Sequence, residues 1–306
     1  MFADDLLADD KLLDCYDNME KVFRRIQAAQ KFTLSKEFAL AADGLVENIP
    51  ELYKIVSYCR LPYPKTWIEW RHDDRPHWDP EGPHKETTRP VDPTRHQGAP
   101  QRVGMLLEQV GEFAGKWKSH LFWSFKHKPT DTESQNNGSL GAIIMDVSKI
   151  SMASEDPLVS ALDGRVGADF GQHLVWTLWQ HRPDIADMLY QYAIEDWGGE
   201  IRFMVAMLGL LNTRNVAHHE HVDKKAHNVK RVKQGRKPLF SHTVLKIRPQ
   251  IWQHSDKDGS GSHRDMRLHF VRGHFKQRKT GLFWWSTHAR GKAEHGIIEK
   301  DYEVLK

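Results

Sequence analysis

Apolar residues recur at intervals of three or four positions in two stretches near the start of the chain, residues 10–30 and 35–59. In an α-helix this spacing gathers apolar side chains on one face, so each stretch predicts an amphipathic helix. Pro62 and Pro64 end the second pattern, because proline lacks a backbone N–H and biases the residue before it towards extended geometry. The aromatic and β-branched residues at 66–70 then predict a strand.

Three more strands are predicted downstream, at residues 102–110, 119–126 and 140–147. Together with residues 66–70 they indicate an antiparallel meander. The intervening residues 71–100 are polar, contain six prolines and show no apolar period. We therefore expect a long, flexible loop there.

Helical spacing returns between residues 169 and 212 and includes the apolar run 203–211. That run is about half of the roughly 20 residues that a membrane span needs, so it predicts a buried central helix and no membrane partner. Residues 223–234 predict a short basic helix, which Gly235 ends.

Strand-like patterns occupy the rest of the chain, at residues 239–247, 267–271, 281–287 and 296–304. The fold class expected from these elements is α+β, with helices packed on antiparallel sheet and a basic β unit at the C-terminal end.

Charge is distributed unevenly along the chain, although the formal net charge is only +3. Residues 213–306 contain 21 Lys+Arg and 9 Asp+Glu, a balance of +12, whereas residues 1–212 contain 23 and 32, a balance of −9. We therefore divide the chain into an acidic, helix-rich α+β part, 1–212, and a basic part, 213–306, with one helix and an antiparallel β unit. Either an anionic partner meets the basic part, or the two parts neutralise each other.

Cationic and aromatic side chains alternate in the strands of the basic part, as single-strand nucleic-acid binding requires. Arginine binds phosphate oxygens through its planar guanidinium, and indole rings stack on unpaired bases. More cations lie on the predicted basic helix and the turn after it. The candidate binding residues are Lys230, Arg231, Lys233, Arg236, Lys237, Arg267, Arg272, Lys279, Trp284, Trp285 and Arg290. The opposing interpretation places the tryptophans in the core and the cations on an ordinary solvated face.

Histidines beside these arginines also permit acid–base chemistry. His269, His274 and His288 would be the catalytic residues of a metal-independent phosphodiesterase or ribonuclease, because paired imidazoles can take up and return a proton. A β-bulge at Gly273 would bring these histidines together.

No metal site and no cofactor is predicted. The run 218–221 has metal-binding residue types, but adjacent side chains point apart, and the polar start of the following helix is the better interpretation. The glycine-rich signatures of nucleotide-binding loops are not found in the sequence. Glu69, Glu108 and Asp146 lie on predicted strands, where outward-facing carboxylates are the ordinary case.

Cys15 and Cys59 are the only cysteines, and each stands among apolar neighbours without a second ligand at metal-binding spacing. This predicts small core residues in a reducing compartment. The start of the chain, Met1 to Asp5, is acidic where a secretory signal would be basic, so we expect a cytoplasmic protein.

Several segments resemble a family of uncharacterised proteins of tailed bacteriophages and prophages. They are Leu210–Thr213, Asn228–Leu239, the pattern Arg267-x-His269-x-Val271-Arg272-Gly273-His274 and Lys300–Tyr302, with a weaker similarity at Leu61–Trp70. The resemblance covers roughly the last hundred residues and that one earlier stretch. It implies the cytoplasm of a bacterial host, or a virion, and it carries no catalytic residue.

The function expected from these patterns is nucleic-acid binding by a phage or prophage protein, through the phosphate backbone and unpaired bases. Single strands are favoured, and RNA and DNA are both open. Two alternatives stand beside this expectation. One is the nuclease described above. The other is a phage structural or host-interaction protein, in which charge asymmetry drives homo-oligomerisation or binding of a protein partner.

Overall fold

The computed structural model describes residues 1–8, 19–46, 48–74, 101–124, 137–149, 200–247, 267–271, 274–285, 288–290 and 292–297. Residues 75–100 of the predicted loop, the helical pattern before residue 200, Cys15 and the segment 298–306 lie outside this described part.

Seven strands form one mixed sheet with the order β5-β4-β3-β2-β1-β7-β6. These strands are β1 (Gln30–Leu34), β2 (Lys65–Arg71), β3 (Arg102–Gln109), β4 (Lys116–Ser124), β5 (Asn137–Asp146), β6 (Ala217–Val222) and β7 (His242–Ile247). From β2 to β5 each strand is antiparallel to the next, which confirms the predicted meander. The expectation of an antiparallel sheet does not hold for β1, which is parallel to both β2 and β7.

Two strands of the sheet are not predicted by the sequence pattern. β1 is five residues long and follows a helix closely, so its alternation is too short to recognise. Residues 218–221, interpreted above as the start of a helix, lie instead in β6, which pairs antiparallel with β7. The strand β6 lies at the edge of the sheet, and its four consecutive polar residues hide the alternation of apolar and polar positions that would identify a strand.

The strands β6 and β7 belong to the basic part of the chain, yet they extend the sheet that the acidic part begins. Phe32, Thr33 and Leu34 of β1 pair with Thr243, Val244 and Leu245 of β7. The expected division at residue 213 therefore falls within one sheet. The charge composition changes at residue 213, but backbone pairing between β1 and β7 joins the segments on either side of that position.

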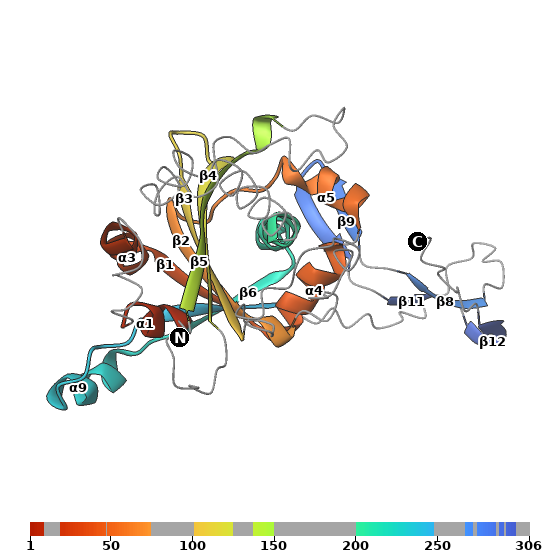
Figure 1. Cartoon of the computed structure of the whole chain (residues 1–306). Helices are drawn as coiled ribbons and strands as arrows, with labels where there is room; N and C mark the ends of the chain where they lie inside the picture. The colour runs from red at the N-terminus through yellow and green to blue at the C-terminus, as the bar shows by residue number, and fades with distance from the viewer. Residues whose placement is uncertain are drawn as a thin grey trace, which may run out of the picture.

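Helices cover both faces of the sheet (Figure 1). On one face, α4 (Lys36–Val46) and α5 (Ile49–Val56) form the crossover between the parallel strands β1 and β2. The helical pattern at 35–59 thus contains two helices, and Pro50 lies in the first turn of the second, where its missing N–H is not needed. On the other face lie α1 (Phe2–Leu6) and α3 (Met19–Ala28). Short 3-10 turns, η1 (His72–Asp74) and η3 (Val147–Lys149), follow β2 and β5.

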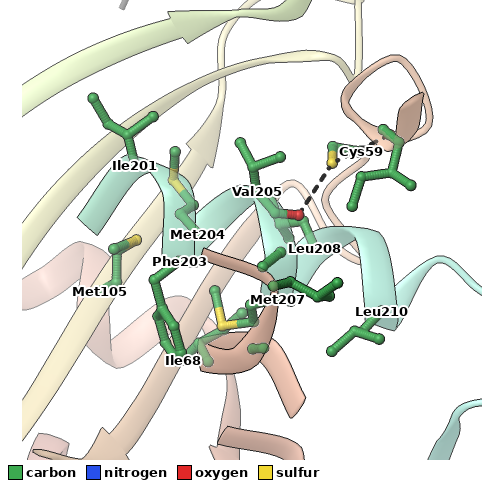
Figure 2. Close-up of a cluster of buried hydrophobic side chains, with 14 of the residues drawn as sticks. Cys59, Ile68, Met105, Ile201, Phe203, Met204, Val205, Met207, Leu208 and Leu210 are labelled. Carbon is green, nitrogen blue, oxygen red and sulfur yellow. Dashed lines mark hydrogen bonds between the residues drawn. The ribbon is translucent and has the colours of Figure 1, made fainter. Parts of the chain in front are cut away.

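The helix at residues 200–211 runs through the interior, between the sheet and the helices α4 and α5 (Figure 1). Its buried side chains point in every direction around the axis (Figure 2): Ile201, Phe203, Met204, Val205, Met207, Leu208 and Leu210. A helix that is apolar all round is stable only when it is enclosed. The prediction of a buried central helix is therefore confirmed.

Contacts with neighbouring elements fix this central helix in place. The Phe203 ring lies 5.0 Å from the ring of Trp70 on β2. The Sδ atom of Met204 accepts hydrogen bonds of 3.3 Å from Trp117 Nε1 and from Ser119 Oγ on β4. Cys59 Sγ donates to the Val205 carbonyl over 3.5 Å, and burial raises the pKa of this thiol to about 12. Cys59 is therefore an unreactive core residue, as predicted.

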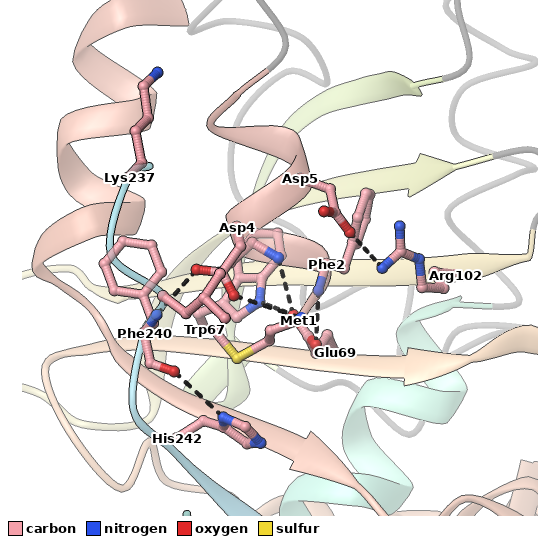
Figure 3. Close-up of polar contacts among 12 residues, drawn as sticks. Met1, Phe2, Asp4, Asp5, Trp67, Glu69, Arg102, Lys237, Phe240 and His242 are labelled. Carbon is pink, nitrogen blue, oxygen red and sulfur yellow. Dashed lines mark hydrogen bonds and ion pairs between the residues drawn. The ribbon is translucent and has the colours of Figure 1, made fainter. Parts of the chain in front are cut away.

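On the other face of the sheet, the buried carboxylate of Glu69 holds the first turn of α1 (Figure 3). Its oxygens accept hydrogen bonds from the backbone N–H groups of Phe2 (2.9 Å) and Ala3 (3.1 Å) and from Trp67 Nε1 (2.8 Å). Burial raises the pKa of Glu69, and these three donors oppose that shift. A carboxylate at a helix N-terminus satisfies N–H groups that the helix itself leaves without acceptors.

Lys31 ends α3 in a complementary way. Its Nζ donates to the carbonyls of Ile26 (2.8 Å), Gln27 (2.9 Å) and Ala29 (2.7 Å), and it lies 4.1 Å from the centre of the Phe240 ring. A cation at a helix C-terminus satisfies the last carbonyls and interacts favourably with the helix dipole. Burial nevertheless lowers the pKa of this lysine to about 8, and the charges of Asp4 and Glu69 only partly offset the effect.

The substitution Lys31→Met is expected to remove a dependence of stability on alkaline pH. The folded protein titrates Lys31 near pH 8, and the unfolded chain near 10.5. A lowered pKa means that the unfolded chain binds the proton more tightly than the folded protein does. The contribution of Lys31 to the free energy of unfolding therefore increases as pH rises from about 8 to 10.5, and this contribution is lost as pH falls through 8. Urea unfolding of both proteins at about pH 7.5 and about pH 10 measures this difference. A difference in stability that stays constant with pH would contradict the assignment.

The described elements confirm the α+β class, with helices on both faces of a mixed sheet. Within the described ranges, no helix is both long enough and apolar enough to cross a membrane.

Candidate nucleic-acid interface

The hairpin of β9 (His274–Arg278) and β10 (Gly281–Trp285) has one face in the core and one face directed outward. In this antiparallel pair Trp284 is opposite Phe275, and Trp285 is opposite His274. Phe275, Leu282 and Trp284 are buried and belong to the same core cluster as the central helix. Because side chains alternate along a strand, the residues between them face the other way.

Polar contacts attach the hairpin to the body of the protein. Asn215, just after the central helix, donates from Nδ2 to the Trp284 carbonyl (2.7 Å) and accepts from the Trp284 N–H at Oδ1 (2.9 Å). Glu51 of α5 accepts a hydrogen bond of 3.1 Å from the Phe275 N–H. Gly281 has a φ of +126°, which favours glycine at the start of β10. The hairpin is therefore held at both strands, and its outward face is presented in a defined orientation.

Cations contact the partly exposed aromatic rings of this outward face. Lys276 Nζ lies 4.8 Å from the centre of the Trp285 ring, and the Arg278 guanidinium carbon lies 5.5 Å from the centre of the Phe283 ring. The His274 ring is 6.1 Å from the Trp285 ring. We name these five residues the hairpin face. The two aromatic residues are partly exposed and the two long cations are exposed.

The structure separates the two adjacent tryptophans that the sequence analysis treated together. Trp284 is 7% exposed and packs 4.8 Å from the Phe275 ring, so it has no surface to offer to a base. Trp285 lies on the hairpin face, and Lys279 is exposed in the turn between the strands. The base-stacking role expected of Trp284 is therefore corrected, because this residue is part of the buried core cluster and α5 contacts β9 on that side of the hairpin.

Three residues of the hairpin face, Lys276, Arg278 and Phe283, are not among the candidates drawn from the sequence. A signal for them exists. His274, Lys276 and Arg278 recur at every second position of one strand, as do Phe283 and Trp285 of the other, with Phe275 and Trp284 between them. In a tight hairpin this period places them on one face.

The basic helix α9 (Lys225–Lys233) lies far from the hairpin. It joins β6 to β7 at the end of an arm that projects beyond the sheet, on the opposite side of the molecule from β9 (Figure 1). Its end is set by Gly235, whose φ is +68°. The predicted helix and its terminator are thus confirmed. Its candidate cations Lys230, Lys233, Arg236 and Lys237 are exposed, and Arg231 is partly exposed and donates from Nε to the Lys237 carbonyl (3.0 Å).

Two further candidates, Arg267 and Arg290, lie in a separate three-stranded sheet with the order β11-β8-β12. Its strands are β8 (Arg267–Val271), β11 (His288–Arg290) and β12 (Lys292–Ile297). Residue Arg267 begins β8, Arg290 ends β11, and Arg272 lies outside the described residues. The described candidate residues are therefore divided among α9, the β9–β10 hairpin and this small sheet.

The three candidate catalytic histidines are not in one sheet. His269 and His288 belong to the antiparallel pair of β8 and β11, where His269 is opposite Arg290. His274 belongs to the β9–β10 hairpin and is opposite Trp285. Gly273, the proposed bulge, lies outside the described residues.

The carboxylates on predicted strands have individual structural partners. Glu69 caps α1, as described above. Glu108 on β3 accepts a hydrogen bond of 2.9 Å from Arg25 of α3, and Asp146 lies 3.6 Å from Lys116 Nζ. In the part of the chain that the structure describes, no group of three or more His, Cys, Asp or Glu residues is arranged to hold a metal ion.

These elements define an α+β protein with a mixed seven-stranded sheet and two exposed cationic surfaces, the hairpin face and α9. No family model matches the chain, and comparison with curated proteins and with solved structures finds no match either.

Proposed function

We propose that this chain binds nucleic acid and that unpaired bases stack on the hairpin face. The observation that carries the proposal is the arrangement of two partly exposed aromatic rings, Phe283 and Trp285, each with a cation against it. Stacking on an aromatic ring supplies about 1–3 kcal/mol per base and tolerates any sequence. The adjacent cations are placed to meet the phosphates that connect those bases.

The spacing of the rings favours single strands. Phe283 and Trp285 are two residues apart on β10, which places their Cα atoms about 6.8 Å apart. This distance suits neighbouring bases that have been separated from each other, whereas bases in a duplex are stacked at about 3.4 Å. In a duplex, moreover, the faces of the bases are covered by their neighbours. Unpaired RNA or DNA therefore fits the hairpin face better than a double helix does.

Origin and compartment belong to the same proposal. The resemblance to phage and prophage proteins supports a role in the cytoplasm of a bacterial host or in a virion. The nuclease alternative gains nothing from the described geometry, because His274 lies in a different sheet from His269 and His288. The structural or host-interaction alternative would show itself as stable assembly without nucleic acid.

Fluorescence polarisation of the full chain with labelled single- and double-stranded RNA and DNA tests the proposal. At about 50 mM and about 200 mM salt, we expect binding that weakens steeply with salt, because counterions are released from the phosphates. The length of the probe after incubation reports cleavage. Binding to none of the probes, or affinity that does not change with salt, would refute nucleic-acid binding. Shortened probe would instead support the nuclease.

A further inference from the structure

The helix α9 presents an apolar stripe that nothing within the described chain covers. No residue of α9 is buried, and Val229 and Val232 are 57% and 59% exposed. They are three residues apart and therefore neighbours on one side of the helix. Valine is a weak helix former, since its branched side chain loses freedom against the preceding turn. Two valines on an exposed helix therefore point to a contact that the described part of the chain does not make.

Positive charge surrounds this stripe. Residues 224–237 contain seven Lys+Arg and no Asp or Glu. Lys225 and Lys233 lie one turn before and one turn after Val229, on the same side of the helix. A partner that meets the valines must therefore also neutralise several cations, which selects a polyanion with apolar groups between its charges.

The arm that carries α9 is held by hydrogen bonds, with no core of its own. Asn228 donates from Nδ2 to the Leu239 carbonyl (2.7 Å) and accepts from the Leu239 N–H at Oδ1 (2.8 Å). The Ser241 hydroxyl accepts from the Lys224 N–H (3.0 Å). At the base, Asp4 accepts from the Phe240 N–H (2.9 Å), and the Lys237 side chain points away from these contacts (Figure 3). The helix is thus oriented before any partner binds.

We propose that α9 enters the major groove of B-form DNA. This inference rests on the proposed nucleic-acid function and assigns a duplex to a surface distinct from the hairpin face. Residues 224–237 contain no Phe, Tyr or Trp on which an unpaired base could stack. A helix about 10–12 Å across fits the major groove of B-DNA, which is about 12 Å wide. The corresponding groove of duplex RNA is too narrow and deep to admit it.

In this arrangement the charged and apolar residues of α9 have separate tasks. Lys225 and Lys233 contact phosphates on the two sides of the groove, which positions the helix without reading sequence. Val229 and Val232 meet the floor of the groove, where thymine presents its C5-methyl group. The expected preference is for base steps that contain thymine. Burying one such methyl group increases affinity about fourfold.

Binding of the full chain to three labelled probes tests the inference. The probes are an alternating dA–dT duplex, the same duplex with deoxyuridine in place of thymidine, and an unstructured oligo-dT. Lys225→Gln with Lys233→Gln should weaken duplex binding. It should also reduce the slope of log affinity against log salt concentration by the amount expected for about two phosphate contacts, and it should leave oligo-dT binding unchanged. Lys36→Gln with Lys65→Gln, which changes two exposed lysines elsewhere, is the matched control.

The valine pair is tested through the methyl group it would contact. Wild-type protein should prefer the thymidine duplex to the deoxyuridine duplex, and Val229→Ser with Val232→Ser should abolish that preference. Neither residue is buried, so this variant should keep the thermal stability of the wild type. A preference that persists in the variant overturns the inference, as does duplex binding that is insensitive to the α9 lysines. Binding of oligo-dT but of neither duplex overturns this inference alone, and binding of no probe overturns the proposed function as well.

Discussion

Simultaneous replacement of Phe283 and Trp285 by alanine is expected to weaken binding of an unstructured oligonucleotide by roughly 30-fold to 25,000-fold. This range follows from the loss of two stacked bases at about 1–3 kcal/mol each. Both rings face away from the core and contact the cations Arg278 and Lys276. Their removal should therefore affect binding far more than folding. Polarisation titrations at low salt measure the effect, and circular dichroism confirms that the variant is folded.

A matched control exists in Phe113, which lies in the turn between β3 and β4. It is 43% exposed, and the Arg60 guanidinium carbon lies 5.1 Å from the centre of its ring. This pair repeats the chemistry of Arg278 and Phe283 at a place that the proposed interface does not include. Phe113→Ala should therefore bind as the wild type does. Equal losses in Phe113→Ala and in the double variant would show that the hairpin face is not the binding site.

The second large effect concerns stability. Phe203→Ala, in the central helix, should lower the free energy of unfolding by about 3–5 kcal/mol, because it removes a fully buried ring and leaves a cavity against Trp70. Urea unfolding followed by far-ultraviolet circular dichroism measures the loss. Val232→Ala on the exposed helix α9 is the control and should change stability by less than about 0.5 kcal/mol.

A loss below about 1 kcal/mol in Phe203→Ala would contradict the enclosed position of the central helix. The same experiment is informative about the hairpin face. Phe275, Leu282 and Trp284 share one core cluster with the central helix. Loosening that core should also release the hairpin, so Phe203→Ala is expected to weaken oligonucleotide binding in proportion to the fraction of unfolded protein.

Local patterns in the sequence predicted much of the secondary structure. The meander from β2 to β5, the apolar helix at residues 200–211 and the basic helix α9 with its terminating Gly235 are all confirmed. Each depends on a period, a turn or a cap that is contained within a few consecutive residues. Such signals do not require knowledge of what lies across the molecule.

Pairings between distant segments were beyond the sequence. The parallel contact between β1 and β7 joins the acidic and basic parts in one sheet, although composition suggested a division at residue 213. The backbone groups that pair two strands are nearly the same for every residue type, so they do not identify the partner strand. In addition, β1 is too short to show a recognisable alternation of apolar and polar residues. The separation of α9 from the hairpin also depends on pairings between distant segments. The helix α9 follows β6, which pairs within the seven-stranded sheet, whereas β9 pairs only with β10 among the described strands.

In the candidate interface, the exposure of individual side chains depends on tertiary packing as well as on sequence. The sequence pattern predicted strands at 267–271 and 281–287 and a mixture of cations and aromatics along them, but it predicted neither β9 nor the pairing of β9 with β10. It could not determine which of the adjacent Trp284 and Trp285 would be exposed. The two are equivalent by local pattern, because the faces of a strand differ only in what covers them. Trp284 belongs to the core cluster that includes the central helix, and α5 contacts β9, so Trp285 is left on the hairpin face.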